Sequence, residues 1–259
     1  MPNKLKLKFK SENFQDFLNK LKDLTTIGDD IKIKIDKEHI LIYSTLGKSV
    51  MLAFKNYLLK TDQYFDLKSD IESSIDIIIS NSTKLVKNLE FLKDNKNITL
   101  NISYQDSDEE ECLVARSIQI TAGKLKVNWL AGEKYQIREI TKQILEQRLD
   151  LKNRNWSFIL DNQQFNNIKK LSNINSENII TITVEDGKVL CSEKAAWELE
   201  VGEIEKKSAS FIFNKRFFKC IDDKKETVEF NLFDSFILIK DNDSNLMLSY
   251  EQDFSEEDV

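Results

Sequence analysis

The sequence predicts an α+β fold of two similar domains, each with two short helices packed on mostly antiparallel sheets. The first observation is that the apolar pattern between Trp156 and Ser192 changes from a period of two to one near 3.6 and back. The same change occurs earlier, between Lys6 and Ser44. The connections are also short, which favours antiparallel pairing. A strand–helix–hairpin unit found once in each half therefore indicates an internal repeat.

The later copy starts with a predicted strand at 156–160, followed by the polar residues 161–164, which are typical of a helix start. A hairpin is predicted over 180–191, with its turn at 185–188. The helix between them is predicted by apolar residues at a spacing near three and a half, namely Phe165, Ile168, Leu171 and Ile174.

The earlier copy has the same order. A strand is predicted over 5–9, Ser11 is the expected N-cap of the helix, and a hairpin is predicted over 31–42. The helix is predicted by the apolar residues Phe14, Phe17, Leu18, Leu21 and Leu24.

Further strands and one further helix complete each half. In the first half, a helix with Leu85, Leu89 and Leu92 follows a cluster of capping residues at 80–83. In the second half, Asn214 is the expected cap of a helix with Phe217, Cys220 and Ile221 inward. The other predicted strands cover 49–54, 63–67, 75–79, 97–103, 111–120, 124–130, 195–201, 208–213, 228–232, 236–240 and 246–250.

The stretch between the halves differs in composition and apolar spacing. Residues 133–155 are polar and charged with loosely spaced apolar positions, a pattern consistent with a short amphipathic helix. We therefore expect a first domain at 1–132, a connector at 133–155 and a second domain at 156–259 that ends in an acidic tail.

Composition points to a cytoplasmic protein. The longest apolar runs are far shorter than the roughly 20 residues of a membrane helix, and the start Met1–Lys6 has no apolar signal segment. We therefore expect no membrane partner. Three cysteines lie far apart without a CxxC pair, as is typical of reduced thiols in a cytosolic protein. They are Cys112, Cys191 and Cys220.

Charge is unevenly distributed along the chain. The net charge of −6 argues at first against nucleic acid, but the acids gather at 106–111, 198–205 and 251–258. The outward faces of the four predicted helices carry cations: Lys20, Lys22, Lys84, Lys87, Lys169, Lys170, Lys215, Arg216 and Lys219. These cations have two possible interpretations. They are ordinary surface residues, or, if the four helices line one surface, they attract a phosphate backbone without contacting the bases.

The doubled pattern resembles a DNA sliding clamp, the polymerase processivity ring. It is most similar to the two-domain T4-type phage clamps and to the eukaryotic and archaeal, PCNA-like clamps. The resemblance covers nearly the whole chain and rests on three stretches: Ile182–Lys188, Asn214–Phe218, and Lys126–Gly132 leading into the connector.

The resemblance implies a non-enzymatic ring that encircles duplex DNA and tethers a replicative polymerase after loading by a clamp loader. Two domains per chain imply a homotrimer, with helices lining the hole, the cations above facing DNA and an acidic exterior. A phage clamp would act in the cytoplasm of an infected bacterium. Edge strands at 124–130 and 195–201 of neighbouring subunits are implied to pair, through Lys124, Val127, Trp129, Ala195, Trp197 and Leu199.

Clamps of this family also bind a short peptide of their partner proteins in an apolar pocket. By position, the resemblance implies Leu46, Val50, Tyr135, Met247 and Tyr250, although each of these residues also suits an ordinary core.

No motif indicates catalysis, a cofactor or a metal. His39 is the single histidine, and it falls in a predicted turn, far from any cysteine pair. Phosphate-binding glycine loops and nucleophile elbows are absent from the sequence. Two alternatives to the ring stay open: a monomeric polymerase accessory subunit that grips DNA by charge, and a two-domain protein-interaction scaffold.

Overall fold

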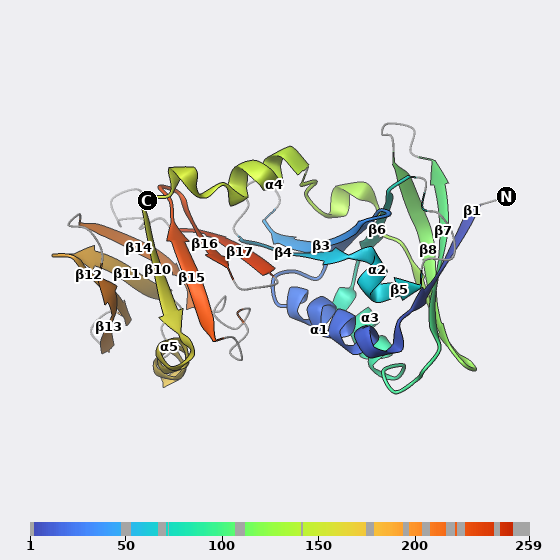
Figure 1. Ribbon diagram of the computed structural model, residues 1–259, viewed down its shortest axis with the longest axis horizontal. Coiled ribbons are helices and arrows are strands. Elements are labelled where there is room, and N and C mark those ends of the chain that lie inside the picture. The colour runs from blue at the N-terminus through green and yellow to red at the C-terminus, as the bar shows by residue number, and fades with distance from the viewer. Residues whose placement is uncertain are drawn as a thin grey trace, which may run out of the picture. The chain divides into compact units, whose positions relative to one another are not determined.

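The computed structural model divides the chain into two compact units, which we describe separately (Figure 1). Unit 1 comprises Met1–Lys48 and Lys55–Glu139, and unit 2 comprises Ser49–Phe54 and Ile140–Val259. The structure describes residues 3–47, 53–66, 71, 73–106, 112–140, 142–174, 179–193, 197–203, 208–215, 221, 226–240 and 244–250. Within these ranges, no helix has both the length and the apolar character needed to cross a membrane.

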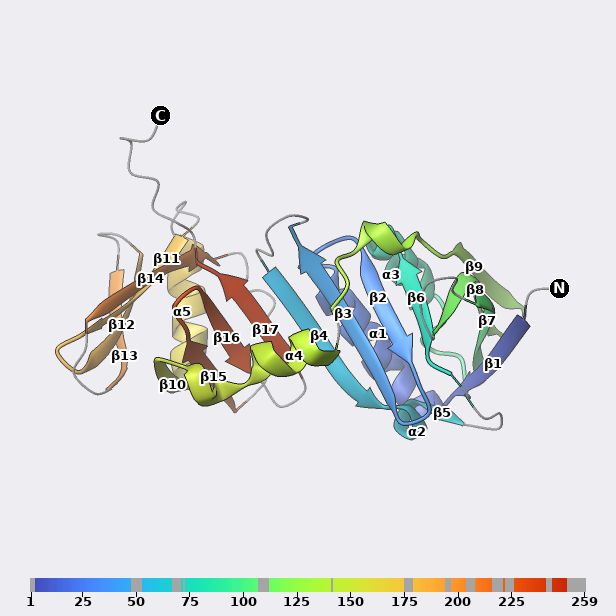
Figure 2. The ribbon, with the colours of Figure 1, turned by 90° about the horizontal axis from the view of Figure 1, so that it is seen from above.

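Unit 1 is a strongly bent arrangement of strands around two main helices. Its strands follow the order β4-β3-β2-β6-β8-β7-β1-β5, and β9 pairs with β8. Figure 2 shows β4, β3, β2 and β6 side by side. The elements are β1 (Asn3–Phe9), a 3-10 turn (Ser11–Asn13), α1 (Phe14–Leu24), β2 (Ile31–Ile35), β3 (His39–Leu46), β4 (Ala53–Lys60), α2 (Thr61–Tyr64), β5 (Phe65–Asp66), β6 (Ile75–Ile79), α3 (Ser82–Glu90), β7 (Ile98–Asp106), β8 (Leu113–Ala122) and β9 (Leu125–Leu130).

The core of unit 1 lies between these strands and the helices α1 and α3. Alternate residues of β1 enter it, and the apolar stripe of α1 packs against them. Phe9 of β1 makes an edge-on contact with Phe14 of α1, with ring centroids 5.0 Å apart. The pairs β1–β5, β1–β7, β2–β3, β2–β6, β7–β8 and β8–β9 are antiparallel, as expected, whereas the short contact of β6 with β8 is parallel.

Two local predictions in unit 1 were wrong. Ser11 does not cap α1, because it begins a 3-10 turn and its hydroxyl donates a hydrogen bond to the Lys96 carbonyl. Of the strand predicted at 63–67, Gln63 and Tyr64 end α2, Phe65 and Asp66 are extended, and Leu67 lies outside the described residues.

The strand expected at 49–54 extends beyond that range, and residues 49–52 lie outside the described residues. Its described part, β4, starts at Ala53 and runs to Lys60. The apolar pattern did not predict this strand beyond Phe54, because the next two residues, Lys55 and Asn56, are polar and yet buried. The Lys55 ammonium lies 2.5 Å from the Asp23 carboxylate of α1.

Unit 2 repeats the strand–helix–hairpin unit, as predicted. β10, α5, β11 and β12 follow one another as β1, α1, β2 and β3 do. The strands form two groups, β13-β12-β11-β14 and β10-β15-β16-β17. The elements are α4 (Lys142–Leu149), a 3-10 turn (Leu151–Asn153), β10 (Trp156–Asp161), α5 (Asn162–Ile174), β11 (Ile179–Glu185), β12 (Lys188–Glu193), β13 (Trp197–Glu203), β14 (Ala209–Asn214), β15 (Thr227–Leu232), β16 (Phe236–Lys240) and β17 (Ser244–Ser249).

The helix predicted after Asn214 lies mostly outside the described residues. On α5, Phe165 and Ile168 are buried as expected. Ile174 was placed wrongly on the buried stripe, because the side chain at this last helical position is 76% exposed.

The start of the connector packs on unit 1, on the sheet face opposite α1 and α3. The Gly132 amide donates to the Ile78 carbonyl at 2.7 Å, and a Cβ at Gly132 would lie 2.5 Å from the Ser80 hydroxyl. Lys32, which is 1% exposed, joins Asp76 at 2.6 Å and also contacts the Glu139 carboxylate. This buried triad fastens the connector to the sheet.

The triad predicts a loss of stability at high pH. Burial alone would lower the pKa of Lys32, but Asp76 and Glu139 outweigh burial, so the pKa is raised above its ordinary value of 10.5. This contribution to stability is complete below pH 10.5 and is lost as the pH rises through the folded-state pKa. We expect the urea midpoint of the protein to fall as the pH rises above 10.5, and to fall less in a Lys32→Met variant. Equal falls in both proteins would contradict this assignment.

Candidate nucleic-acid interface

Helices α1 and α3 pack side by side in unit 1 and present their outer faces to solvent (Figure 1). Lys84 and Lys87 of α3 are exposed, and neither forms an ion pair with another described residue. Lys22 of α1 is also exposed, but it pairs with Glu90 of α3 at 3.1 Å. This pair screens part of the positive charge, so Lys84 and Lys87 are the main free cations of this helix face.

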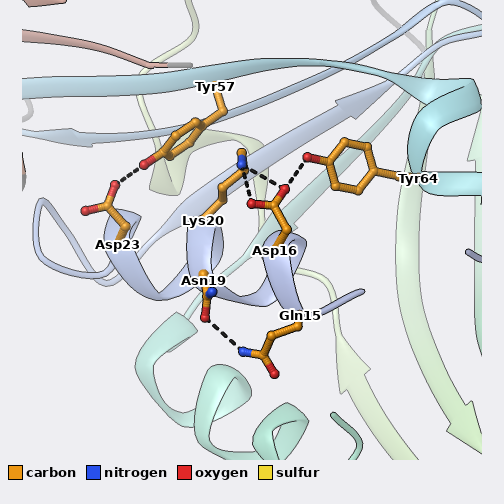
Figure 3. A network of polar contacts seen from close by, with 7 residues as sticks. All are labelled: Gln15, Asp16, Asn19, Lys20, Asp23, Tyr57 and Tyr64. Carbon is orange, nitrogen blue, oxygen red and sulfur yellow. Dashed lines mark hydrogen bonds and ion pairs between the residues drawn. The ribbon is translucent and has the colours of Figure 1, made fainter. Parts of the chain in front are cut away.

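Lys20 differs from the expectation of a cation that faces solvent. Its side chain is 11% exposed and bonds to Asp16, one helical turn earlier, at 2.7 Å. Figure 3 shows Lys20 between Tyr57 and Asp16, and the hydroxyl of Tyr64 donates to the same carboxylate. Lys20 therefore helps to fix α1 against β4 and α2, and we leave it out of the DNA-facing set proposed below.

Of the two predicted cations on α5 of unit 2, Lys170 is exposed. Lys169 is half-buried, with its ammonium 5.4 Å from the centre of the Phe165 ring. Lys215 is 17% exposed and is held by the Ser172 carbonyl at 2.8 Å and the buried Glu193 carboxylate at 3.3 Å. Lys215 therefore also departs from the expectation of a free cation. Arg216 and Lys219 lie outside the described residues.

The two strands expected to join subunits are both at sheet edges. In the described part of the chain, β9 pairs only with β8, and β13 pairs only with β12. Each therefore leaves one row of backbone donors and acceptors open to a further strand.

The two tryptophans of these edge strands are anchored within their own units. The Trp129 indole donates to the Ser80 carbonyl at 3.2 Å, and the Trp197 indole donates to Glu193 at 3.0 Å. Lys124 is exposed in the turn before β9, whereas Val127 and Leu199 are half-buried on the two edges; Ala195 lies outside the described residues.

Comparison with solved structures identifies the fold. A chain of a PCNA2–PCNA3 complex from Sulfolobus tokodaii matches over 95% of this chain and 99% of its own, with 13% identity and a TM-score of 0.63. The A. fulgidus PCNA, solved with the C-terminal region of FEN-1 bound, matches over 96% and 99%, with 7% identity and a TM-score of 0.63. The Helicobacter pylori beta clamp bound to a DNA ligase peptide matches over 97% of this chain but 66% of its own, with 13% identity and a TM-score of 0.68.

The chain has the fold of the DNA sliding clamps. It spans almost the full length of the PCNA chains and about two thirds of the beta clamp. The comparison with protein-family models found no match, and neither did the comparison with curated proteins. The likeness is therefore one of structure, carried by the order and pairing of the elements.

The residues predicted for a partner-peptide pocket of this clamp fold have different environments. In unit 1, Tyr135 is 79% exposed and Leu46 is half-buried. In unit 2, Met247 is 3% exposed and belongs to the core, which departs from the expectation of an accessible pocket residue. Tyr250 is half-buried, and burial raises the pKa of its phenol. Val50 lies outside the described residues.

Sequence reasoning missed one charged surface. We expected an acidic exterior, but the outer face of β1, β7, β8 and β9 carries Lys4, Lys6, Lys8 and Lys126. The signal was present in the sequence, because three of these lysines alternate with Leu5, Leu7 and Phe9, which enter the core.

Proposed function

We propose that this chain is a sliding clamp, of which three copies close head to tail into a ring that encircles duplex DNA and tethers a replicative polymerase without catalysis. The observation that carries this proposal is the open edge of β9 in unit 1 and of β13 in unit 2. One open edge on each unit allows a heterologous contact that repeats from copy to copy and closes when the rotation fits.

The chemistry of the two edges is complementary. On β9, Val127 and Trp129 lie on the side of the core, whereas Lys126 is exposed on the other side. On β13, Val201 is buried and Glu198 is exposed. Pairing of the two strands would join apolar side chains on one face and bring an ammonium near a carboxylate on the other.

The cations that support contact with DNA are Lys84, Lys87 and Lys170, with a smaller contribution from Lys22. All four lie on exposed helix faces. Long, flexible ammonium side chains contact phosphates without reading bases, so they suit a ring that moves along any sequence.

Native mass and topological retention test the ring. We expect a mass of three chains. We also expect the protein to thread onto bead-bound linear duplex and, once the free end is capped with streptavidin, to resist a wash in about 1 M salt, which screens charge contacts beyond roughly 3 Å. Cutting the duplex should release it. A monomeric mass, or loss of all protein in the wash, would favour the charge-based accessory subunit.

A charge exchange tests the pairing of β9 with β13. Lys126→Glu should place two carboxylates together at the contact. The protein concentration below which the trimer dissociates should therefore rise about tenfold. Glu198→Lys should weaken it similarly, and the double variant should regain most of the stability. Sedimentation velocity measures all three. If the double variant is as weak as the sum of the single variants, these strands do not meet.

We further propose that a polymerase and a clamp loader dock a short peptide beside the exposed Tyr135. The solved clamps with FEN-1 and DNA ligase peptides support this mode of binding for the fold. We also propose, from the resemblance to phage clamps, that the ring acts in the cytoplasm of an infected bacterium.

A further inference from the structure

One face of the unit 1 sheet is built from three rows of cross-strand neighbours. The register of β1, β7, β8 and β9 places four residues in each row. We call these twelve residues the polar sheet face. The rows are Lys4, Ser103, Ser117 and Leu130; Lys6, Asn101, Gln119 and Asn128; and Lys8, Thr99, Thr121 and Lys126.

This face is positive although the protein is negative overall. It contains four lysines, seven uncharged hydroxyl or amide residues and one leucine, but no acid. Lys8 is partly neutralised by Asp66 at 3.8 Å, whereas Lys4, Lys6 and Lys126 form no ion pair within the described part of the chain. In a chain with a net charge of −6, such a segregated surface attracts an anionic partner.

The face is also hollowed. An open depression of about 500 Å³ lies over it. Its polar lining includes Lys4 and the amide and hydroxyl residues of the first two rows, and its apolar lining is Ile102, Ile118, Trp129 and Leu130. The Gln119 amide donates to Asn128 at 2.7 Å, which orients this part of the surface. The Ser103 and Ser117 hydroxyls make no hydrogen bond to another described residue, so they can bond to a ligand.

The side-chain types of this face match those that contact a nucleic-acid backbone. Lysine, serine, threonine, asparagine and glutamine are the types that contact phosphates and sugars. Protein interfaces are enriched in buried aromatic and arginine anchors, and the twelve positions of this face include neither. Base stacking would need aromatic rings, and these are equally absent from its twelve positions.

We propose that the polar sheet face is a second DNA-binding surface, which holds the phosphate backbone of a duplex outside the ring without sequence preference. The lysines of β1 stand on alternate residues, about 6.8 Å apart along the strand, and so form a line that can follow a backbone. This surface belongs to one unit and does not require ring closure.

The test uses the full chain and a fluorescein-labelled linear duplex of about 20 base pairs, which is too short to retain a ring. Wild type should bind it at low salt, as followed by anisotropy. The Lys4→Gln/Lys6→Gln variant should bind more weakly, and the slope of log K against log salt should shrink by about 1.8, or 0.9 for each lost phosphate contact. Lys126 is left intact because it lies on the proposed subunit edge. The control is Lys37→Gln/Lys60→Gln, which removes two exposed lysines elsewhere and should keep the wild-type slope.

Lysine acetylation gives a second readout. DNA should protect Lys4 and Lys6 from acetylation in the wild type, as measured by mass spectrometry. The proposal is overturned if the duplex does not bind, if the variant keeps the wild-type slope, or if polyglutamate displaces the duplex better than unlabelled DNA at equal charge. Retention on end-capped duplex should be unchanged in the Lys4→Gln/Lys6→Gln variant. The two proposals can therefore fail independently: loss of the polar sheet face as a binding surface does not contradict the ring, and loss of the ring does not contradict this surface.

Discussion

Replacing Lys32 with methionine is expected to lower the free energy of unfolding of unit 1 by roughly 3 kcal/mol, because it leaves the buried Asp76 carboxylate without its ion-pair partner. Asp76 is 4% exposed, and its second oxygen has no hydrogen-bond partner in the described structure and only Lys34 at 4.0 Å. Loss of Lys32 also releases Glu139, which holds the end of unit 1. Lys34 can move closer, which places the expected loss at the lower end of the range for broken buried pairs.

The measurement is a urea titration followed by fluorescence of Trp129, in a background with Trp156 and Trp197 replaced by phenylalanine. Trp129 then reports on unit 1 alone, because the other two tryptophans lie in unit 2. The control is Lys32→Met/Asp76→Leu, which replaces the charged pair by apolar groups and should recover most of the lost stability. A double variant no more stable than Lys32→Met would show that lost packing, and not an unpaired charge, causes the effect.

The repeated core could be predicted from the sequence because it depends on local periodicity. The apolar stripe of α1 and the apolar alternation of β1 can both be recognised from residues close together in the sequence. The helix and the strand occur where the apolar period predicts them. The strand β4 could not be found in this way. Its burial of Lys55 depends on Asp23, which lies 32 positions earlier in the chain and on another element.

The candidate site was less predictable for the same physical reason. A lysine beside an apolar helix stripe has the same sequence pattern whether it faces solvent or an internal acceptor. Lys20 and Lys215 meet such acceptors, whereas Lys84 and Lys170 do not meet one among the described residues. The strands at 124–130 and 195–201 were predicted from their residues, but their place at sheet edges was implied only by the family resemblance, because open backbone groups leave no mark in a sequence.

Reversing the charge of Lys84, Lys87 and Lys170 is expected to abolish threading onto end-capped duplex while the trimer persists. A closed ring of three chains would present nine of these side chains to the hole, so the variant would line it with nine carboxylates. Their repulsion of the phosphate backbone removes the counterion release that drives entry. None of the three lies on β9 or β13, so native mass should still give three chains.

The matched control reverses Lys37, Lys60 and Lys152, which are equally exposed but lie outside α3 and α5. Both variants change the net charge by the same amount, so a general repulsion between an acidic protein and DNA would impair both. Selective loss in the Lys84, Lys87 and Lys170 variant means that position, and not total charge, decides the interaction. Equal loss in both variants would show that these helices do not face the DNA. Threading at the wild-type level in both variants would show that the three lysines serve only to keep the protein soluble. Because threading is scored after a high-salt wash, binding at the polar sheet face does not contribute to the result.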